Sequence, residues 1–317
     1  MKPFEIGGVV VEPGETRRLE VPVMRLVTQT EVSIPVTVVH GTKPGPRLWL
    51  SAALHGDELN GTEIIRRVLQ RVLASRLRGT LVAVPVVNVI GFLEQSRYLP
   101  DRRDLNRSFP GSERGSLAAR MAHLFLTQIV DQCTHGIDIH TGSHHRANLP
   151  QLRCDLDNPE VRKIAAAFGA PIMIHGKTIA GTLRDAATKH GIPILVYEAG
   201  EPMRFNRRAI AIGARGAMHV IQSLGMLPGP RRKREVPTLE IRRTTWVRAH
   251  RSGIVDLHVK LGDHVEKGQL MGIVRDAFGE TVGDVHATHT GLVIGISRNP
   301  LVHRGEALTH IADILGP

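Results

Sequence analysis

Residues 47–58 read RLWLSAALHGDE, and this stretch decides the fold. Its first part is a nearly continuous apolar run, which is typical of a strand buried on both sides, as in the parallel sheets of α/β proteins. Its last four residues are small or polar, and a helix-like segment near residues 61–78 follows. A buried strand that ends in a polar turn before a helix predicts the first unit of an α/β fold.

The same rhythm continues outward from this stretch to about residue 224. We expect further strands at residues 80–88, 136–140, 171–175 and 194–198. We expect helices near residues 116–133, 158–168, 181–190 and 206–224. Alternation of this kind predicts a mixed, largely parallel sheet flanked by helices.

The two ends of the chain follow other patterns. Residues 1–45 alternate apolar and polar positions between turn signals, which predicts a few antiparallel strands as an N-terminal β extension. Residues 225–237 contain three prolines and four basic residues, which we interpret as an exposed linker. We therefore predict a main domain over residues 1–228 and a small β-rich domain over residues 238–317.

The predicted second domain has its own resemblance. Residues 252–274, SGIVDLHVKLGDHVEKGQLMGIV, resemble the half-motif of lipoyl and biotinyl carrier domains, which implies an all-β, barrel-sandwich-like fold. A working carrier holds its cofactor on a lysine, and no lysine follows Lys267, so the carrier function is excluded. We expect this domain to shape the entrance of an active site or to mediate assembly. Four of its histidines match no known ligand spacing, and we interpret them as solvated or capping residues: His286, His289, His303 and His310.

Net charge, aromatic content and hydropathy indicate which kinds of partner the protein can have. The net charge is +11, from 41 basic and 30 acidic residues, which suits an anionic substrate but also a nucleic acid or a membrane. Aromatic residues make up 3% of the chain, so stacking platforms for nucleic acid are scarce, and we expect no nucleic-acid partner. The longest apolar run, residues 81–93, is broken by Pro85 and Asn88 and is too short to cross a bilayer, so we expect no membrane partner.

Cysteine usage and the N-terminus bear on the compartment. Cys133 and Cys154 are too few for a disulfide framework and fit a reducing compartment. The first residues, MKPFEIGGVVVEPGE, place acids and glycines where a secretory signal needs an apolar stretch. We therefore predict a cytoplasmic protein.

Four polar stretches carry the chemistry. They are residues 55–58 (HGDE), 104–107 (DLNR), 138–141 (DIHT) and 197–200 (YEAG). Three of them end or directly follow a predicted strand, and the DLNR stretch lies in a loop. Ligands collect at the carboxyl ends of strands in α/β sheets, so we expect the four stretches to meet in one site.

The first and third stretches suggest a metal site. A catalytic zinc takes three protein ligands and leaves one position for water. His55 and Glu58 are three residues apart and can converge from one helical turn, and His140 can supply the third ligand from another strand. An isolated HxxE spacing is a weak signal, since a strand-end histidine often bonds only to backbone.

The fourth stretch offers a proton carrier. Attack by a metal-activated water needs a carboxylate that takes the proton of the water and passes it to the leaving group. Glu198 follows an apolar strand, where a carboxylate without a task would be costly. The alternative is a structural acid paired with a nearby arginine. Tyr197 should point to the other side of the strand and serve packing.

The second stretch and the arginines near it offer donors. Asn106 and Arg107 can bind a carboxylate of a substrate, and a guanidinium can stabilise the tetrahedral intermediate. Several arginines upstream qualify for that second role: Arg97, Arg102 and Arg103. Asp104 can orient an arginine or a metal-binding histidine from behind. The alternative is an ordinary surface ion-pair cluster.

In this order, the four stretches resemble the succinylglutamate desuccinylase/aspartoacylase family, a branch of the zinc carboxypeptidase-like fold. The resemblance covers about residues 20–225. It implies one Zn²⁺ per chain held by three ligands, His55, Glu58 and His140, with Glu198 as general base and acid. It implies a substrate site that includes Asp104, Asn106 and Arg107, the last two on the α-carboxylate. It also implies an upstream arginine, Arg97 or Arg102, on the scissile carbonyl.

The leading hypothesis is a zinc-dependent amidohydrolase that deacylates a small anionic N-acyl amino acid of the acetyl or succinyl type. Residues 1–228 would form the zinc hydrolase domain. One subgroup of the family acts on diaminobutyrate derivatives in ectoine breakdown and supplies a candidate substrate. Two alternatives stay open: a zinc metallocarboxypeptidase that acts on a short peptide, and a non-catalytic metal-binding protein for assembly or sensing. We also expect a homo-oligomer.

Overall fold

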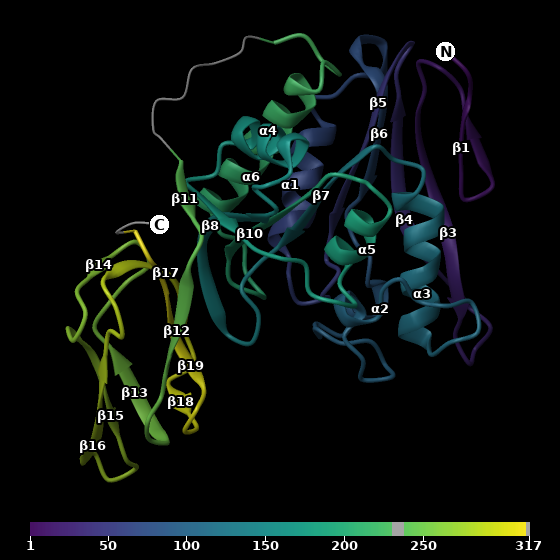
Figure 1. Cartoon of the computed structure of the whole chain (residues 1–317). Coiled ribbons are helices and arrows are strands. Elements are labelled where there is room, and N and C mark those ends of the chain that lie inside the picture. Colours follow the sequence, from purple (N-terminus) through teal and green to yellow (C-terminus); the bar gives the residue numbers. More distant parts are fainter. Residues whose placement is uncertain (230–237, 315–317) are drawn as a thin grey trace.

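The computed structural model describes residues 1–229 and 238–314 (Figure 1). The basic run of the expected linker, residues 231–234, lies outside these described residues. Within them, one mixed sheet of 13 strands runs from the N-terminal part of the chain into the C-terminal part. Helices flank this sheet, so the molecule has the mixed α/β architecture that the alternating pattern predicts.

The centre of the sheet is parallel. It consists of four neighbouring strands: β6 (Arg78–Val84), β5 (Lys43–Ala52), β7 (His135–His140) and β10 (Ile194–Gly200). Most residues of these strands are buried, because helices cover both faces of the sheet. The four strands run in the same direction, so their carboxyl ends meet at one edge. This edge carries the HGDE turn, His140 and Glu198, and the candidate site lies there.

Helices cover both faces of the sheet. One face packs against α1 (Asn60–Leu69), α4 (Pro159–Phe168) and α6 (Arg207–Ser223). The other packs against α3 (Leu117–Phe125), a π-helix (Leu126–Val130) and α5 (Leu183–Lys189). Shorter helices are α2 (Val89–Leu93) and the 3₁₀ turns Ala74–Arg76 and Leu105–Arg107. None of the helices in the described ranges combines the length and apolar character that crossing a bilayer requires.

The N-terminal strands belong partly to the same sheet. β1 (Phe4–Ile6) and β2 (Val9–Val11) form a separate hairpin. β3 (Thr16–Arg25) and β4 (Glu31–His40) are antiparallel, and β4 pairs with β6 at one edge of the parallel centre. The expected antiparallel strands are therefore present, and two of them extend the central sheet.

The sequence pattern missed β8 (Arg146–Cys154), which is central to the architecture. β8 runs antiparallel to β10 on one side. On its other side the sheet forks: residues 146–148 pair with β17 (Gly291–Ser297), and residues 151–154 pair with β9 (Ile172–His175). Parallel pairing thus dominates only the centre of the sheet, whereas we expected a largely parallel sheet.

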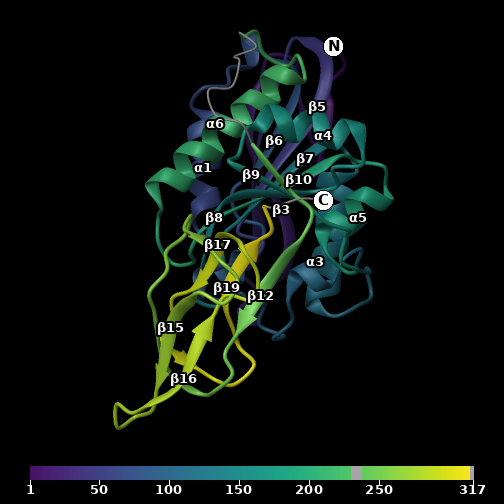
Figure 2. The same ribbon diagram turned by 60° about the vertical axis from the view of Figure 1, so that its left-hand side comes forward.

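The C-terminal residues form a β module that shares strands with the main sheet. β12 (Thr244–Arg248), β19 (Ala307–Ala312) and β17 continue the 13-stranded sheet beyond β8, and Figure 2 shows β17 and β19 leading from the module toward β8. Opposite them lies a four-stranded sheet: β13 (Gly253–Leu257), β15 (Leu270–Arg275), β16 (Thr281–His286) and β18 (Leu301–Val302). Two short strands belong to the 13-stranded sheet as well: β11 (Leu239–Ile241) pairs with β9, and β14 (His264–Val265) pairs with β17.

Two apolar clusters hold the module. One fills its interior, including Val247, Met271 and Ile311. The other joins it to the main domain, where Ile172 of β9 packs with Ile294 of β17. The module is therefore bonded and packed to the main domain at the side of the sheet where the candidate site lies.

Candidate active site

His55, Glu58 and His140 form a buried group at the carboxyl edge of the parallel strands. They are 3%, 1% and 3% exposed, and each offers a ligand atom within 4.8 Å of the others. The Nδ1 atom of His55 lies 2.8 Å from one oxygen of Glu58, and the Nδ1 atom of His140 lies 2.8 Å from the other. Two imidazole nitrogens and one carboxylate match the donor set of catalytic zinc sites, so this group could hold a metal ion.

The HGDE turn explains how His55 and Glu58 converge. The backbone N–H of Glu58 donates to the carbonyl of His55, and α1 begins only at Asn60, so the two ligands share a turn ahead of the helix. Gly56 makes the turn possible: a Cβ atom there would lie 1.9 Å from the carbonyl carbon of Gly91. Any side chain at this position would push the turn away from α2.

Two carboxylates support the histidines from behind. Oδ2 of Asp138 lies 2.7 Å from Nε2 of His140, and the hydroxyl of Ser51 donates to Oδ1 of the same carboxylate. Oδ1 of Asp104 lies 3.3 Å from Nε2 of His55. Carboxylates behind metal-binding histidines fix the ring orientation and raise the basicity of the ligand. Asp104 therefore lies behind His55 and outside the pocket lining, which fits the orienting position expected for it and not the substrate-binding one.

The charges of this group are fixed by mutual pairing. Burial disfavours the charged form of Glu58, but His55 and His140 outweigh it and hold the pKa of Glu58 well below its usual value. Burial likewise opposes ionisation of Asp104, yet His55 and Arg97 keep its pKa low. Both carboxyl groups are therefore ionised at neutral pH, and Glu58 supplies the negative charge that a divalent cation needs.

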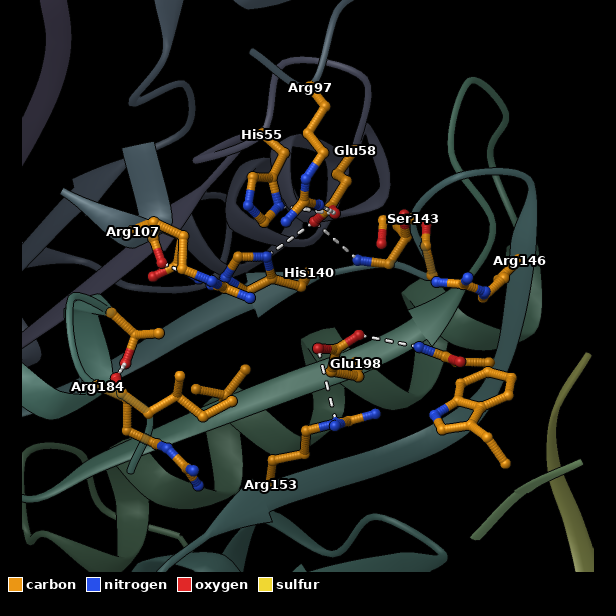
Figure 3. Close-up of a pocket in the computed structure, with 18 residues that line it drawn as sticks. His55, Glu58, Arg97, Arg107, His140, Ser143, Arg146, Arg153, Arg184 and Glu198 are labelled. Atoms are coloured by element: carbon orange, nitrogen blue, oxygen red, sulfur yellow. Dashed lines mark hydrogen bonds and ion pairs between the residues drawn. The ribbon is translucent and has the colours of Figure 1, made fainter. Parts of the chain in front are cut away.

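Glu198 lies across the pocket from these ligands (Figure 3). It pairs in register with His140 on the neighbouring strand, and its side chain is 18% exposed. The amide of Asn148 donates to Oε2 of Glu198 at 2.9 Å, and Nε of Arg153 lies 3.7 Å from Oε1. The carboxylate is thus oriented by one hydrogen bond and open to the pocket, instead of closed in a tight ion pair. Tyr197 on the same strand points away and is fully buried, as expected.

The structure separates the two candidate arginines. Arg97 lines the pocket, donates to Asp104 at 2.8 Å and places Nη1 3.6 Å from Glu58. Arg102 is exposed and does not line the pocket, so the structure does not bring it to the site. The neighbouring Arg103 is also exposed. Sequence spacing does not distinguish Arg97 from Arg102, because both precede the DLNR stretch by a few residues.

Asn106 and Arg107 line the pocket next to α5. Oδ1 of Asn106 accepts the backbone N–H of Leu183 at 2.9 Å, which leaves the NH₂ group of Asn106 able to donate to a ligand. Thr182 and Arg184 line the same part of the pocket. This end is therefore rich in donors, as a site for a carboxylate should be.

Sequence reasoning missed the residues that form the opposite wall. Arg146, Asn148 and Arg153 come from β8, and Trp246 comes from β12 of the C-terminal module. The signal that could have found them is composition, because RANLPQLRC holds two arginines and an asparagine within nine residues.

The pocket is strongly cationic. Its volume is about 270 Å³, and its lining holds the arginines Arg97, Arg107, Arg146, Arg153 and Arg184 but only two acids, Glu58 and Glu198. This excess of guanidinium groups favours an anionic ligand.

Of three further histidines, two are exposed and one is buried. His144 and His145 are exposed in the loop after β7 and do not line the pocket. His310 does not meet the expectation of a solvated or capping residue: it is 3% exposed and stacks on Trp246, with ring centroids 4.4 Å apart. Burial and nearby cationic groups lower the pKa of His310 to about 3, so the ring is neutral.

Comparison with known proteins places this geometry in a family. Residues 44–224 match the model of the succinylglutamate desuccinylase/aspartoacylase catalytic domain. An N-alpha-acetyl-L-2,4-diaminobutyric acid deacetylase from Halomonas elongata is 28% identical over 297 residues, which cover 90% of this chain and 86% of that protein.

Solved structures agree over almost the whole chain. A succinylglutamate desuccinylase/aspartoacylase from Rhodobacter sphaeroides superposes with a TM-score of 0.86 at 24% identity and covers 97% of this chain and 98% of its own. The product-bound ectoine utilization protein EutE (DoeB) from Ruegeria pomeroyi gives 0.85 at 25% identity and 94% coverage of both chains. The family match spans more than half of the chain and includes all four polar stretches, and the chain therefore belongs to the succinylglutamate desuccinylase/aspartoacylase family.

Proposed function

We propose that this protein is a zinc-dependent deacylase that hydrolyses the amide bond of a small N-acyl amino acid. The observation that carries the proposal is the buried group of His55, Glu58 and His140 facing the open carboxylate of Glu198 across a cationic pocket. The relatives support it, because one is named as a deacetylase of an N-acetylated amino acid and the family is named for a desuccinylase and an acylase.

The three ligands would hold one Zn²⁺ per chain. When bound, zinc would act as a Lewis acid and lower the pKa of a water molecule enough for attack at neutral pH. Asp138 and Asp104 would keep the two imidazole rings oriented toward it, as their contacts with Nε2 of His140 and His55 indicate.

Glu198 would act as general base and then as general acid. Its carboxylate takes a proton from the attacking water and returns it to the nitrogen of the leaving amino acid as the C–N bond breaks. Asn148 orients the carboxylate for both transfers through its bond to Oε2. The products are a free amino acid and the carboxylate of the acyl group.

Donors around the pocket would position the substrate. Asn106 and Arg107 would bind the α-carboxylate of the amino acid, and Arg97 would polarise the scissile carbonyl from its place beside Glu58. Binding the amino acid at one end and the carbonyl in the middle leaves the far end of the pocket for the acyl group.

Two further parts of the proposal concern the whole molecule. We assign the main sheet and its site to the zinc carboxypeptidase-like architecture, and the C-terminal strands to a barrel-sandwich-like module. Assembly as a homo-oligomer and a cytoplasmic location remain predictions from sequence.

A substrate panel with defined metal content tests the function. The purified protein, loaded with Zn²⁺, is assayed on N-acetyl, N-formyl and N-succinyl amino acids and on dipeptides with a free C-terminus, with amine release as the readout. We expect turnover of N-acyl amino acids well above that of dipeptides, lost with a chelator and restored by Zn²⁺. Preference for dipeptides would establish a carboxypeptidase instead, and zinc binding without turnover of any compound would establish a non-catalytic metal protein.

A further inference from the structure

The pocket has two ends on either side of the metal group. Figure 3 shows Arg107 and Arg184 on one side of His140 and Glu198, and Ser143 and Arg146 on the other. We call the first the amino-acid end, because Asn106 and Arg107 lie there, and the second the module end. A substrate held with its scissile carbonyl between the metal group and Glu198 would therefore extend its acyl group toward the module end.

Arg146 dominates the module end. Its guanidinium carbon lies 5.1 Å from the ring centre of Trp246, a cation–π distance, and Trp246 in turn stacks on His310 with an interplanar angle of 5°. In the part of the chain that the structure describes, no carboxylate lies within ion-pair distance of Arg146. The guanidinium is thus held by an aromatic ring and keeps its donors available.

The C-terminal module builds this arrangement from the paired strands. Asn148 of β8, Gly295 of β17, His310 of β19 and Trp246 of β12 are cross-strand neighbours. A Cβ atom on Gly295 would lie 3.0 Å from Cβ of His310, 3.2 Å from Oδ1 of Asn148 and 3.4 Å from the Trp246 ring. Glycine therefore allows the tryptophan to lie close over the sheet beside the asparagine that orients Glu198.

We propose that Arg146, positioned by Trp246, binds an anionic group at the end of the acyl chain, so that the preferred substrate is the half-amide of a dicarboxylic acid with an amino acid. This inference rests on the proposed function and adds the class of acyl group. A guanidinium pairs with a carboxylate through two parallel hydrogen bonds, which a methyl group cannot replace. An acetyl group would leave Arg146 without a partner and the module end unfilled.

Substrate pairs that differ only in the acyl group test the proposal. N-succinyl and N-acetyl derivatives of the same amino acid are compared for kcat/KM, in wild type and in Arg146→Gln. We expect wild type to favour the succinyl compound at least about 10-fold. We expect Arg146→Gln to lower kcat/KM for that compound by about 10- to 100-fold, the effect of losing a hydrogen bond to a charged group, with little change for the acetyl compound.

Two more variants separate charge from position. Trp246→Ala should reduce the preference for the succinyl compound several-fold, whereas Trp246→Phe should retain most of it, because the ring that holds Arg146 remains. Arg251→Gln is the matched control: Arg251 is an exposed arginine of the module and does not line the pocket. It removes the same charge and should leave the preference unchanged.

Product binding distinguishes this inference from the function on which it rests. Calorimetry with succinate and with acetate should show tighter binding of succinate to wild type, and this difference should vanish in Arg146→Gln. A wild-type preference for acetyl compounds, or an equal loss for both compounds in Arg146→Gln, would overturn the inference and leave the deacylase function intact. No turnover together with Arg146-dependent succinate binding would overturn the function and keep the anion site.

Discussion

The two walls of the pocket are built on different principles. The metal wall, His55, Glu58 and His140, stands on parallel strands whose ends are buried, and short contacts of 2.7 to 2.8 Å link its rings to carboxylates. The module wall, Arg146, Asn148 and Trp246, stands on antiparallel strands of β8 and the C-terminal module, and ring stacking holds its arginine. Paired charges fix the metal wall, whereas Arg146 in the module wall is held by a ring and keeps its donors free.

This difference suggests that the metal wall serves catalysis and the module wall serves substrate selection. Groups that must hold one geometry during catalysis need rigid support, which the metal wall has. Groups that select among acyl chains need unpaired donors in a defined place, which Arg146 offers. Variants of the metal wall should thus remove activity toward every substrate, and variants of Arg146 or Trp246 should change which substrate is preferred.

The largest effect is expected at a metal ligand. His55→Ala removes one of three protein donors, so bound zinc and hydrolysis of all substrates should both fall to background. Metal analysis of the purified variant together with an amine-release assay checks this. His258→Ala, which removes an exposed histidine of the module, should keep both. Full zinc occupancy in His55→Ala would reject the ligand set.

Glu198→Gln comes next and isolates the proton carrier. The amide keeps the shape but cannot accept the proton, so kcat should fall by about 10²- to 10⁴-fold while the zinc content stays unchanged. Glu201→Gln, a partly exposed glutamate nearby that pairs with Arg298, serves as the control and should retain activity. Activity of Glu198→Gln equal to wild type would refute the assigned role.

A smaller effect is expected one layer behind the metal wall. Asp138→Asn keeps the size of the side chain but weakens the support of His140, since Asp138 contacts Nε2 of that ring at 2.7 Å. Zinc affinity should fall by about 10- to 100-fold, measured by competition with a chromophoric chelator. A zinc affinity of Asp138→Asn equal to that of wild type would mean that Asp138 only fills space.

The smallest effect is expected on the free energy of unfolding at acidic pH, through His310 beside the module wall. Burial lowers the pKa of His310 to about 3, helped by Arg153 and Arg146 on β8 and by His289, from a usual value of 6.5. Between these pH values the unfolded chain binds a proton that the folded chain does not. Stability should therefore fall as the pH drops from 6.5 toward 3, by at most about 1.4 kcal/mol per pH unit, and show no such loss above 6.5.

Urea unfolding at pH 7 and pH 5 measures this loss. The free energy of unfolding of wild type should drop between the two values by about 2 kcal/mol more than that of His310→Gln, which has no titrating ring. Equal drops in the two proteins would mean that His310 is as exposed to protons in the folded state as in the unfolded chain.

The sequence predicted the parallel half of the molecule better than the other half. Apolar runs that end in polar stretches predicted β5, β7 and β10. At the ends of these strands the structure brings His55, His140 and Glu198 together. Each of those strands can be predicted from its own residues, because a strand that is buried on both faces needs a continuous apolar run. The choice between Arg97 and Arg102 depends on loop geometry, which spacing does not encode.

The other half depends on pairing between distant segments. β8 contains Pro150 and two arginines, so its pattern does not read as a buried strand, and its partners are up to about 150 residues away in the chain. Nothing local shows that β17 would join β8 and bring Trp246 to the pocket. Burial of His310 was missed for the same reason, because it arises from packing between the module and β8.

The fork in the sheet has a consequence for how the protein can be divided. β17 satisfies the outer edge of β8 at residues 146–148, so a fragment without residues 238–317 would leave peptide groups of that edge bare. Bare strand edges recruit other chains and seed aggregates. The seam between the two parts is therefore a poor place for truncation or for exchanging modules between relatives, and the chain should be handled as one cooperative unit.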